Sequence, residues 1–157
     1  MGQAELPSIC PECGAPQYPD ATCRLCFEGL LAFEAERPAA FGAVHHLTVT
    51  SWVLQHPAGY SREALLALRE QLSLILTGEI SISGLRRLNT QRFSGAAKVK
   101  ATPGNAVARL ADDWEMHVID VFDPRGDLPA TDAYVERARA WAMSIRDRLS
   151  RADRTGK

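Results

Sequence analysis

Four cysteines near the N-terminus are the residues whose type and spacing most clearly predict chemistry. They form two pairs, Cys10-Pro-Glu-Cys13 and Cys23-Arg-Leu-Cys26, with nine residues between the pairs. Thiolates separated by two residues can converge on one ion, and two such pairs complete the tetrahedral shell of a structural zinc site. A shell filled by four protein ligands leaves no open position for catalysis. We therefore expect Cys10, Cys13, Cys23 and Cys26 to bind one structural Zn2+ ion.

Three other roles compete for the same cysteines: a redox dithiol, two disulfides and an iron centre. Disulfide frameworks usually connect distant loops, whereas all four cysteines fall between residues 10 and 26. This clustering in pairs favours metal, and among metals it favours zinc. Gly14 permits a backbone whose amides turn toward sulfur, and Arg24 can help to neutralise the thiolates. We expect metal binding to supply much of the folding free energy of so short a segment.

Histidines are the second group that could do chemistry. His45, His46 and His56 lie on one expected helix, and His117 lies elsewhere in the chain. His45 and His56 would be about 16 Å apart along that helix, too far for one ion. His46 and His117 could form a mixed metal site or supply a general base with a carboxylate from Asp113, Glu115 or Asp120. In the structural alternative, His45 or His46 hydrogen-bonds within the core and His56 caps the end of the helix.

A basic stretch is a candidate for phosphate binding. Six basic residues occur without an intervening acid: Arg86, Arg87, Arg92, Lys98, Lys100 and Arg109. The first five are the candidate contacts to phosphate or nucleic acid. An acidic stretch follows and could fold back to neutralise them: Asp112, Asp113, Glu115, Asp120, Asp123 and Asp127.

Composition restricts the function classes. The chain has 157 residues, 46% hydrophobic and 24% charged, enough for one modest domain with a small appendage. The formal net charge of -1 gives no global attraction to nucleic acid or an anionic membrane. No signal peptide, spanning stretch, phosphate-binding glycine loop, nucleophile elbow, HExxH motif or deaminase signature is recognisable. We expect a cytoplasmic protein without membrane association.

Helices must position these residues. The sequence predicts a helix over 27–36 that ends at Pro38, with its positive N-terminal end facing the thiolates. Residues 43–56 predict a buried central helix that ends at Pro57, although their β-branched residues also permit a strand. Ser61 and Gly78 delimit a third, amphipathic helix, and a shorter helix follows from Ser81 or Ser83 to Asn89.

The C-terminal part is expected to contain one long helix. Thr131 can cap it, and one apolar stripe follows at helical spacing: Tyr134, Ala138, Trp141, Ile145 and Leu149. Residues 114–122 predict a short strand or an extended arm packed against the helices. The expected fold is mainly α, with a small zinc knuckle, ribbon or treble-clef-like, on a helical bundle. We divide the chain into a knuckle with the first helix (1–37), a helical domain (38–151) and a frayed tail (152–157).

Several segments together resemble a known family. The chain contains CPECGAP, then GAVHHLTV and LQHP, and finally AYVERARAWA. With these segments it resembles an uncharacterised bacterial domain-of-unknown-function family over nearly its whole length. The resemblance implies zinc binding and carries no established activity.

These observations favour a non-enzymatic zinc-binding protein that interacts with a protein or nucleic acid. The alternative is a small metal- or histidine-dependent enzyme. Its pocket would lie between the helix of His45 and His46 and the 114–123 segment, with His45, His46 and His117 as the catalytic candidates.

Overall fold

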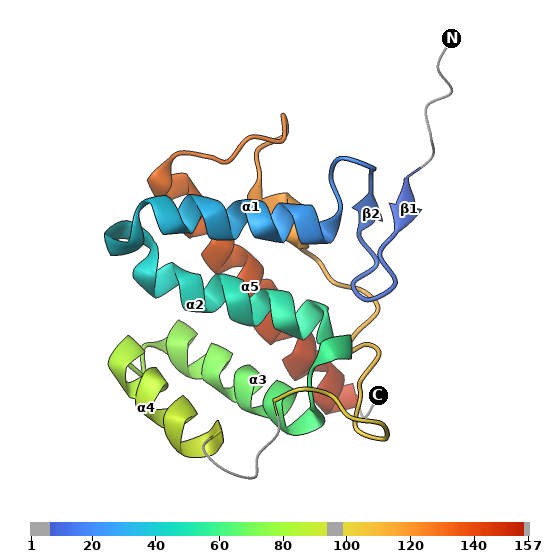
Figure 1. Ribbon diagram of the computed structural model, residues 1–157, viewed down its shortest axis with the longest axis vertical. Helices are drawn as coiled ribbons and strands as arrows, with labels where there is room; N and C mark the ends of the chain where they lie inside the picture. Colours follow the sequence, from blue (N-terminus) through green and yellow to red (C-terminus); the bar gives the residue numbers. More distant parts are fainter. Residues whose placement is uncertain (1–6, 94–98, 156–157) are drawn as a thin grey trace.

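The computed structural model describes residues 7–93 and 99–155. It is mainly helical, as predicted, with a single small sheet at the N-terminal end of the described chain. Strands β1 (Ser8–Ile9) and β2 (Pro16–Gln17) pair antiparallel, with Ser8 opposite Gln17 and Ile9 opposite Pro16. This hairpin carries the first cysteine pair and lies beside the start of the first helix (Figure 1).

The helical body is built around α2 (Pro38–Gln55). This helix contacts α1 (Cys23–Glu36), α3 (Arg62–Thr77) and α5 (Thr131–Thr155). In Figure 1, α1, α2 and α3 lie one below another, and α5 crosses behind α2. Burial on several faces follows from the apolar composition of α2, whose buried residues include Phe41, Leu47 and Leu54. The predicted buried central helix is confirmed.

Two helix boundaries depend on residues that the sequence identified. Ser61 caps α3, its hydroxyl accepting a hydrogen bond from the Ala64 amide at 3.1 Å, and Gly78 ends the helix in the left-handed conformation (φ 75°). Pro38 has a role that the sequence does not predict. It is expected only to end the first helix, whereas it is the first residue of α2. Proline suits the first turn of a helix, where its missing amide hydrogen leaves no bond unmade.

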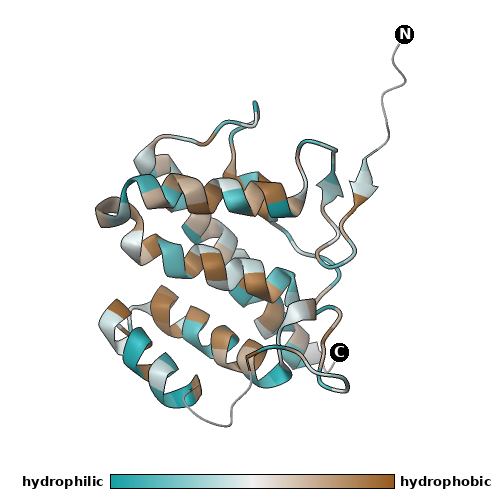
Figure 2. Cartoon of the chain, in the orientation of Figure 1, coloured by the Kyte–Doolittle hydropathy of each residue, from teal (hydrophilic) through white to brown (hydrophobic). Residues whose placement is uncertain are grey.

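The remaining elements lie at the edges of the body. The short 3-10 helix η1 (Pro57–Gly59) follows α2. Helix α4 (Ile82–Phe93) extends beyond the predicted end at Asn89, and Figure 2 shows hydrophilic residues over much of it. Helix α5 continues to Thr155, so 152–155 are helical.

The segment between residues 99 and 130 forms an arm across the helices. Within 114–122 the structure has the 3-10 helix η2 (Val118–Val121) and no strand. This helix contacts α1 and α5, and Val118 and Val121 are fully buried. Of the two predicted alternatives for this segment, the packed arm is the one observed.

The core joins α2 and α5. All five residues of the predicted stripe on α5 are buried: Tyr134, Ala138, Trp141, Ile145 and Leu149. The Trp141 indole donates a hydrogen bond to the Gln55 side chain at 3.0 Å, and the Gln55 amide donates to the Met116 carbonyl at 2.7 Å. These two bonds connect the C-terminal end of α2 to α5 and to the arm. They therefore hold this end of the helix in a fixed position in space.

Candidate metal centre

The hairpin loop presents the first cysteine pair. The Cys10 amide donates to the Ala15 carbonyl at 2.9 Å, and the Gly14 amide donates to the Cys10 carbonyl at 2.9 Å. Gly14 has a φ of 80°, a left-handed conformation that glycine adopts without strain. The resulting tight turn buries both Cys10 and Cys13.

Helix α1 presents the second pair. Thr22 is its N-cap, with the hydroxyl accepting a hydrogen bond from the Leu25 amide at 3.2 Å. Cys23 is therefore the first residue of the helix, where the positive end of the helix dipole favours a thiolate. Cys26 lies one turn further along α1.

The C-terminal end of α2 contributes a histidine to the same place. The His56 side chain is 7% exposed, and its ring stacks on the Trp52 indole with centroids 3.6 Å apart. Its Nδ1 lies 3.1 Å from the Trp52 carbonyl oxygen, which can only accept, so Nδ1 carries the hydrogen. The neutral ring then offers Nε2 as a lone-pair donor, as in metal sites where a backbone carbonyl fixes the tautomer.

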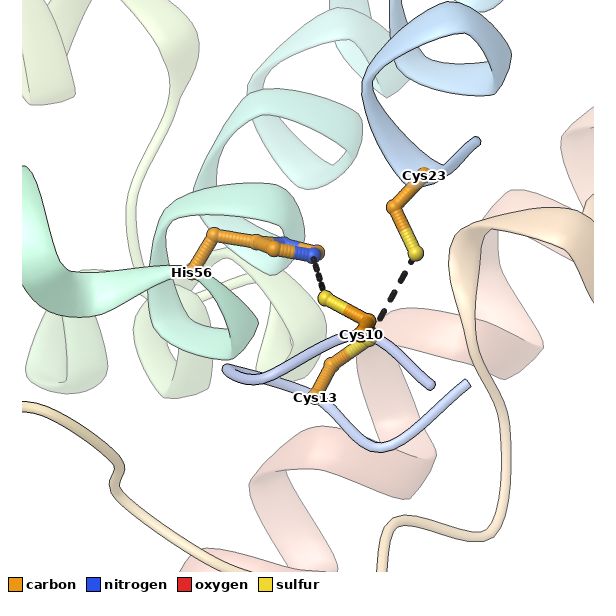
Figure 3. Close-up of side chains that lie close together, drawn as sticks. All are labelled: Cys10, Cys13, Cys23 and His56. Carbon is orange, nitrogen blue, oxygen red and sulfur yellow. Dashed lines mark hydrogen bonds between the residues drawn. The ribbon is translucent and has the colours of Figure 1, made fainter. Parts of the chain in front are cut away.

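Cys10, Cys13, Cys23 and His56 form one buried group (Figure 3). Their four ligand atoms all lie within 4.8 Å of one another. The Cys13 and Cys23 sulfurs are 3.6 Å apart, and the Cys10 sulfur is 3.6 Å from His56 Nε2. In a tetrahedral zinc site two sulfurs lie about 3.8 Å apart, and a sulfur and an imidazole nitrogen about 3.6 Å apart. The group is therefore compatible with a metal ion, and no disulfide joins its cysteines.

The titration behaviour of the thiols reflects this crowding. A hydrogen bond with Cys23 lowers the pKa of the Cys13 thiol to about 4, against the opposing effect of burial. The same hydrogen bond, together with burial and the charges of Cys13 and Cys10, raises the pKa of the Cys23 thiol. These opposite shifts correspond to one thiolate and one protonated thiol that share a hydrogen bond, whereas a divalent ion between the sulfurs would favour two thiolates.

Contacts around the group hold the hairpin to the body. The Ala58 amide donates to the Glu12 carboxylate at 2.9 Å, and Arg109 Nε donates to the Pro11 carbonyl at 2.7 Å. His117 Nε2 donates to the Cys13 carbonyl at 3.1 Å. A hydrogen bond with Asp120 raises the pKa of His117, and so favours a positive charge beside the thiolates.

This group differs from the predicted four-cysteine set in one member. Cys26 is buried but is not part of it, and His56 stands in the group instead. Cys26 lines a groove with Leu25 and Gly29, and burial raises the pKa of its thiol. The sequence interpretation assigned His56 only a helix-capping role. The one local feature that marks His56 is its place directly before Pro57, because the end of the helix holds the histidine in a fixed position.

His117 does not join the other two histidine candidates, His45 and His46, whose ring centroids are 6.0 Å apart. His45 Nδ1 lies 2.6 Å from a Glu34 carboxylate oxygen, whereas His117 contacts the hairpin. His46 precedes His56 by ten residues, about 15 Å along α2, so it lies near the middle of that helix and away from the end that carries His56. His45 and His46 line a cavity to which no described residue of 114–123 contributes. The cavity at His45 and His46 is therefore a different one from the pocket expected between these histidines and the 114–123 segment.

The candidate phosphate contacts are dispersed. Arg92 forms an ion pair with Glu70 of α3 at 2.7 Å, Arg87 is exposed, and Arg86 lines the cavity beside α2. Lys100 forms a backbone bridge with Tyr60, and Lys98 lies outside the described residues. Two residues of the acidic stretch pair with α5, Asp113 with Arg148 and Glu115 with Arg151, and Asp112 pairs with Arg109 of the basic stretch.

Comparison with known proteins identifies the family of the chain. The fold and the site define a helical protein with an N-terminal Cys3His cluster that could hold a metal ion. The chain belongs to a family of unknown function, DUF5946, whose model matches residues 8–150. The resemblance predicted from the sequence is thereby confirmed. No curated protein and no solved structure matches the chain. No helix in the described ranges combines the length and apolar character needed to cross a membrane.

Proposed function

We propose that this chain is a non-enzymatic protein-interaction module whose N-terminal hairpin is fastened by one structural zinc ion. The observation that carries the proposal is the convergence of four buried ligand atoms from Cys10, Cys13, Cys23 and His56, all within 4.8 Å of one another. Thiolates with one imidazole suit zinc, and four protein ligands leave no position for water or substrate. Reduced thiols and bound zinc suit a reducing compartment, so the proposal includes a cytoplasmic location.

The zinc ion would join three segments that are distant in sequence. They are the hairpin loop, the first turn of α1 and the end of α2. The two-stranded sheet is too small to be stable alone, because each strand has two residues. Structural zinc in small domains contributes about 10–16 kcal/mol of apparent binding free energy at pH 7. Metal binding would thus hold the hairpin surface in one conformation.

That surface carries exposed apolar side chains. Ile9, Tyr18 and Leu25 are 61%, 44% and 49% exposed, and all three lie on or beside the hairpin. Tyr18 and Leu25 line a groove of about 760 Å³ between the hairpin, α1 and the η2 segment, with Ile119 and Phe122 on its other side. Clustered exposed apolar residues of this kind mark interaction sites on soluble proteins.

Charge in the groove favours a basic partner over nucleic acid. Its charged lining residues are Asp20, Asp120, Asp123 and Arg137. Three carboxylates against one guanidinium give the lining an acidic formal charge, although Asp120 pairs with His117 and Asp123 with Arg125 outside it. Phosphate would be repelled, whereas a short segment with apolar side chains and a lysine or arginine would be complementary. We assign such a segment of a protein partner as the occupant.

A displayed peptide library tests this proposal. The zinc-loaded protein should enrich peptides that combine apolar side chains with at least one basic residue. Leu25→Glu should abolish their binding, whereas Leu66→Glu, at a 60% exposed leucine on α3 that does not line the groove, should not. Failure to enrich any such peptide, or equal binding by both variants, would refute the assignment. Tighter binding to single-stranded DNA than to peptides would refute it as well.

A further inference from the structure

A second cavity lies toward the other end of α2. It has a volume of about 500 Å³ and lies between α1 and α2, with Arg86 of α4 at its rim. Its apolar lining includes Leu31, Pro38 and Phe41. The volume falls within the range of small-molecule sites, about 300–1,000 Å³. The groove beside the hairpin shares none of the residues that line this cavity.

A buried carboxylate organises one wall. Glu34 is 3% exposed and accepts hydrogen bonds from the hydroxyls of Thr48 and Tyr134. Burial, followed by the hydrogen bond to Glu34, raises the pKa of Tyr134, so the phenol stays protonated as a donor. His45 Nδ1 is the third partner, at 2.6 Å from Glu34 Oε2. These bonds fix the His45 ring with Nε2 left for another partner, and 47% of its side chain is exposed.

Basic side chains gather at the same cavity. His46 and Arg86 line it together with His45. Arg86 forms no ion pair with any residue that the structure describes. Burial, and then the charges of His45 and Arg86, lower the pKa of His46. The carboxylate of Glu34 is the one acidic group in the lining, and three donors already occupy it. The cavity therefore brings together a guanidinium without an ion-pair partner among the described residues and two imidazoles, while the Glu34 carboxylate is engaged by its own three hydrogen-bond partners.

We propose that this cavity binds a small organic anion, with Arg86, His46 and His45 Nε2 contacting a phosphate or carboxylate group and the apolar wall holding the body of the ligand. A guanidinium and imidazoles are the donors suited to such oxyanions. A metal ion is a poorer fit, because Cys10, Cys13, Cys23 and His56 are the one group with metal-ligand spacing among the described residues.

Calorimetric titration of the zinc-loaded protein tests this inference. The probes are phenyl phosphate and benzoate, with inorganic phosphate for the charge alone and benzyl alcohol for the apolar body alone. At least one aromatic anion should bind about tenfold more tightly than either control. Preference for phenyl phosphate assigns a phosphate ester, and preference for benzoate assigns a carboxylate. Binding of benzyl alcohol as tightly as the anions, or of no probe at all, would overturn the inference.

Two neighbouring arginines provide matched variants. Arg86→Gln should weaken binding of the preferred anion about tenfold, because it removes a charged hydrogen bond. Arg87→Gln removes the same charge from the next residue of α4, which does not line the cavity, and should leave binding unchanged. Equal effects of the two substitutions would show that binding is non-specific and would refute the site.

The pH dependence of anion binding distinguishes a contact between His46 and the anion from a purely structural role of His46. The groups facing His46 are Glu34 from α1, His45 from its own helix and Arg86 from α4. A bound anion favours the protonated imidazole, so it should raise the pKa of His46 and bind more tightly as pH falls from 8 to about 6. Ring-proton NMR titrations with and without the anion measure this shift. His46→Gln should remove most of the pH dependence; its persistence unchanged would contradict a contact between His46 and the anion.

Discussion

Replacing His56 distinguishes the two ligand sets that the chain can offer to zinc. His56→Phe removes both ring nitrogens but keeps an aromatic ring to stack on Trp52, where the native centroids are 3.6 Å apart. Cys26→Ser removes the one cysteine outside the group of ligand atoms. Cys23→Ser removes a cysteine that both sets share. His56→Phe therefore removes a candidate ligand while keeping the aromatic packing, Cys23→Ser shows the effect of losing a shared ligand, and Cys26→Ser shows the effect of replacing a cysteine outside the group.

The expected magnitude follows from the role of His56. Substituting residues that only orient a ligand costs about 10–100-fold in metal affinity. Loss of a ligand itself should exceed this, so we expect His56→Phe and Cys23→Ser to weaken zinc binding at least 100-fold, or about 2.7 kcal/mol. Cys26→Ser should leave the affinity unchanged, because its sulfur does not belong to the group.

Competition with a chromophoric chelator at pH 7 measures these affinities, with far-ultraviolet circular dichroism as the control for the helical body. The reasoning would be refuted if Cys26→Ser weakened zinc binding as strongly as Cys23→Ser while His56→Phe did not. That pattern would restore the four-cysteine set predicted from the sequence.

Two further predictions concern the helical body. Gly42 lies inside α2, and a methyl group there would meet nothing within 4 Å, so Gly42→Ala should stabilise the protein by about 0.5–1 kcal/mol and raise the melting temperature by roughly 1–4 °C. Gly84→Ala is the control, because its Cβ would lie 3.1 Å from Ile80 Cγ1; a rise in melting temperature as large as that of Gly42→Ala would contradict the packing argument. Arg148 lowers the pKa of the Asp113 carboxyl by a hydrogen bond, so this pair stabilises the fold above the ordinary carboxyl pKa, and its contribution is lost as pH falls through the lowered value. Carboxyl-carbon NMR should show the Asp113 pKa rising in Arg148→Gln; an unchanged pKa would show that the pair does not persist in solution.

Long periodic segments made the helical body predictable from sequence. The stripe from Tyr134 to Leu149 and the Ser61 and Gly78 boundaries are local features, and the structure confirms them. Pro38 shows the limit of such reasoning. Proline both excludes continuation of a helix and suits the first turn of the next, so its presence alone does not say which role prevails.

The ligand group depends on contacts that no local pattern contains. Two cysteine pairs predict a metal site, but whether Cys26 or His56 joins it depends on how the end of α2 lies against the hairpin. That position is fixed by the hydrogen bonds of Gln55 with Trp141 and Met116, which are 86 and 61 residues away. The division at residues 37 and 151 stays a prediction.

Long-range contacts also determine the second cavity. Glu34 lies on α1, and no local pattern in the sequence of that helix marks it as buried. Tyr134, which is 100 residues away, and Thr48 bury it and supply its hydrogen bonds. The sequence predicts that His45 hydrogen-bonds within the core or joins a catalytic group. Its contact with the buried Glu34 agrees with the first alternative, although no local pattern identifies Glu34 as the partner.

X-ray absorption at the zinc edge of the purified protein tests the central claim most directly. We predict one zinc ion per chain, with three sulfur ligands at about 2.3 Å and one nitrogen ligand at about 2.0 Å. Four sulfur ligands would contradict the assignment of His56, and a protein purified under reducing conditions that binds no zinc would contradict the metal centre itself.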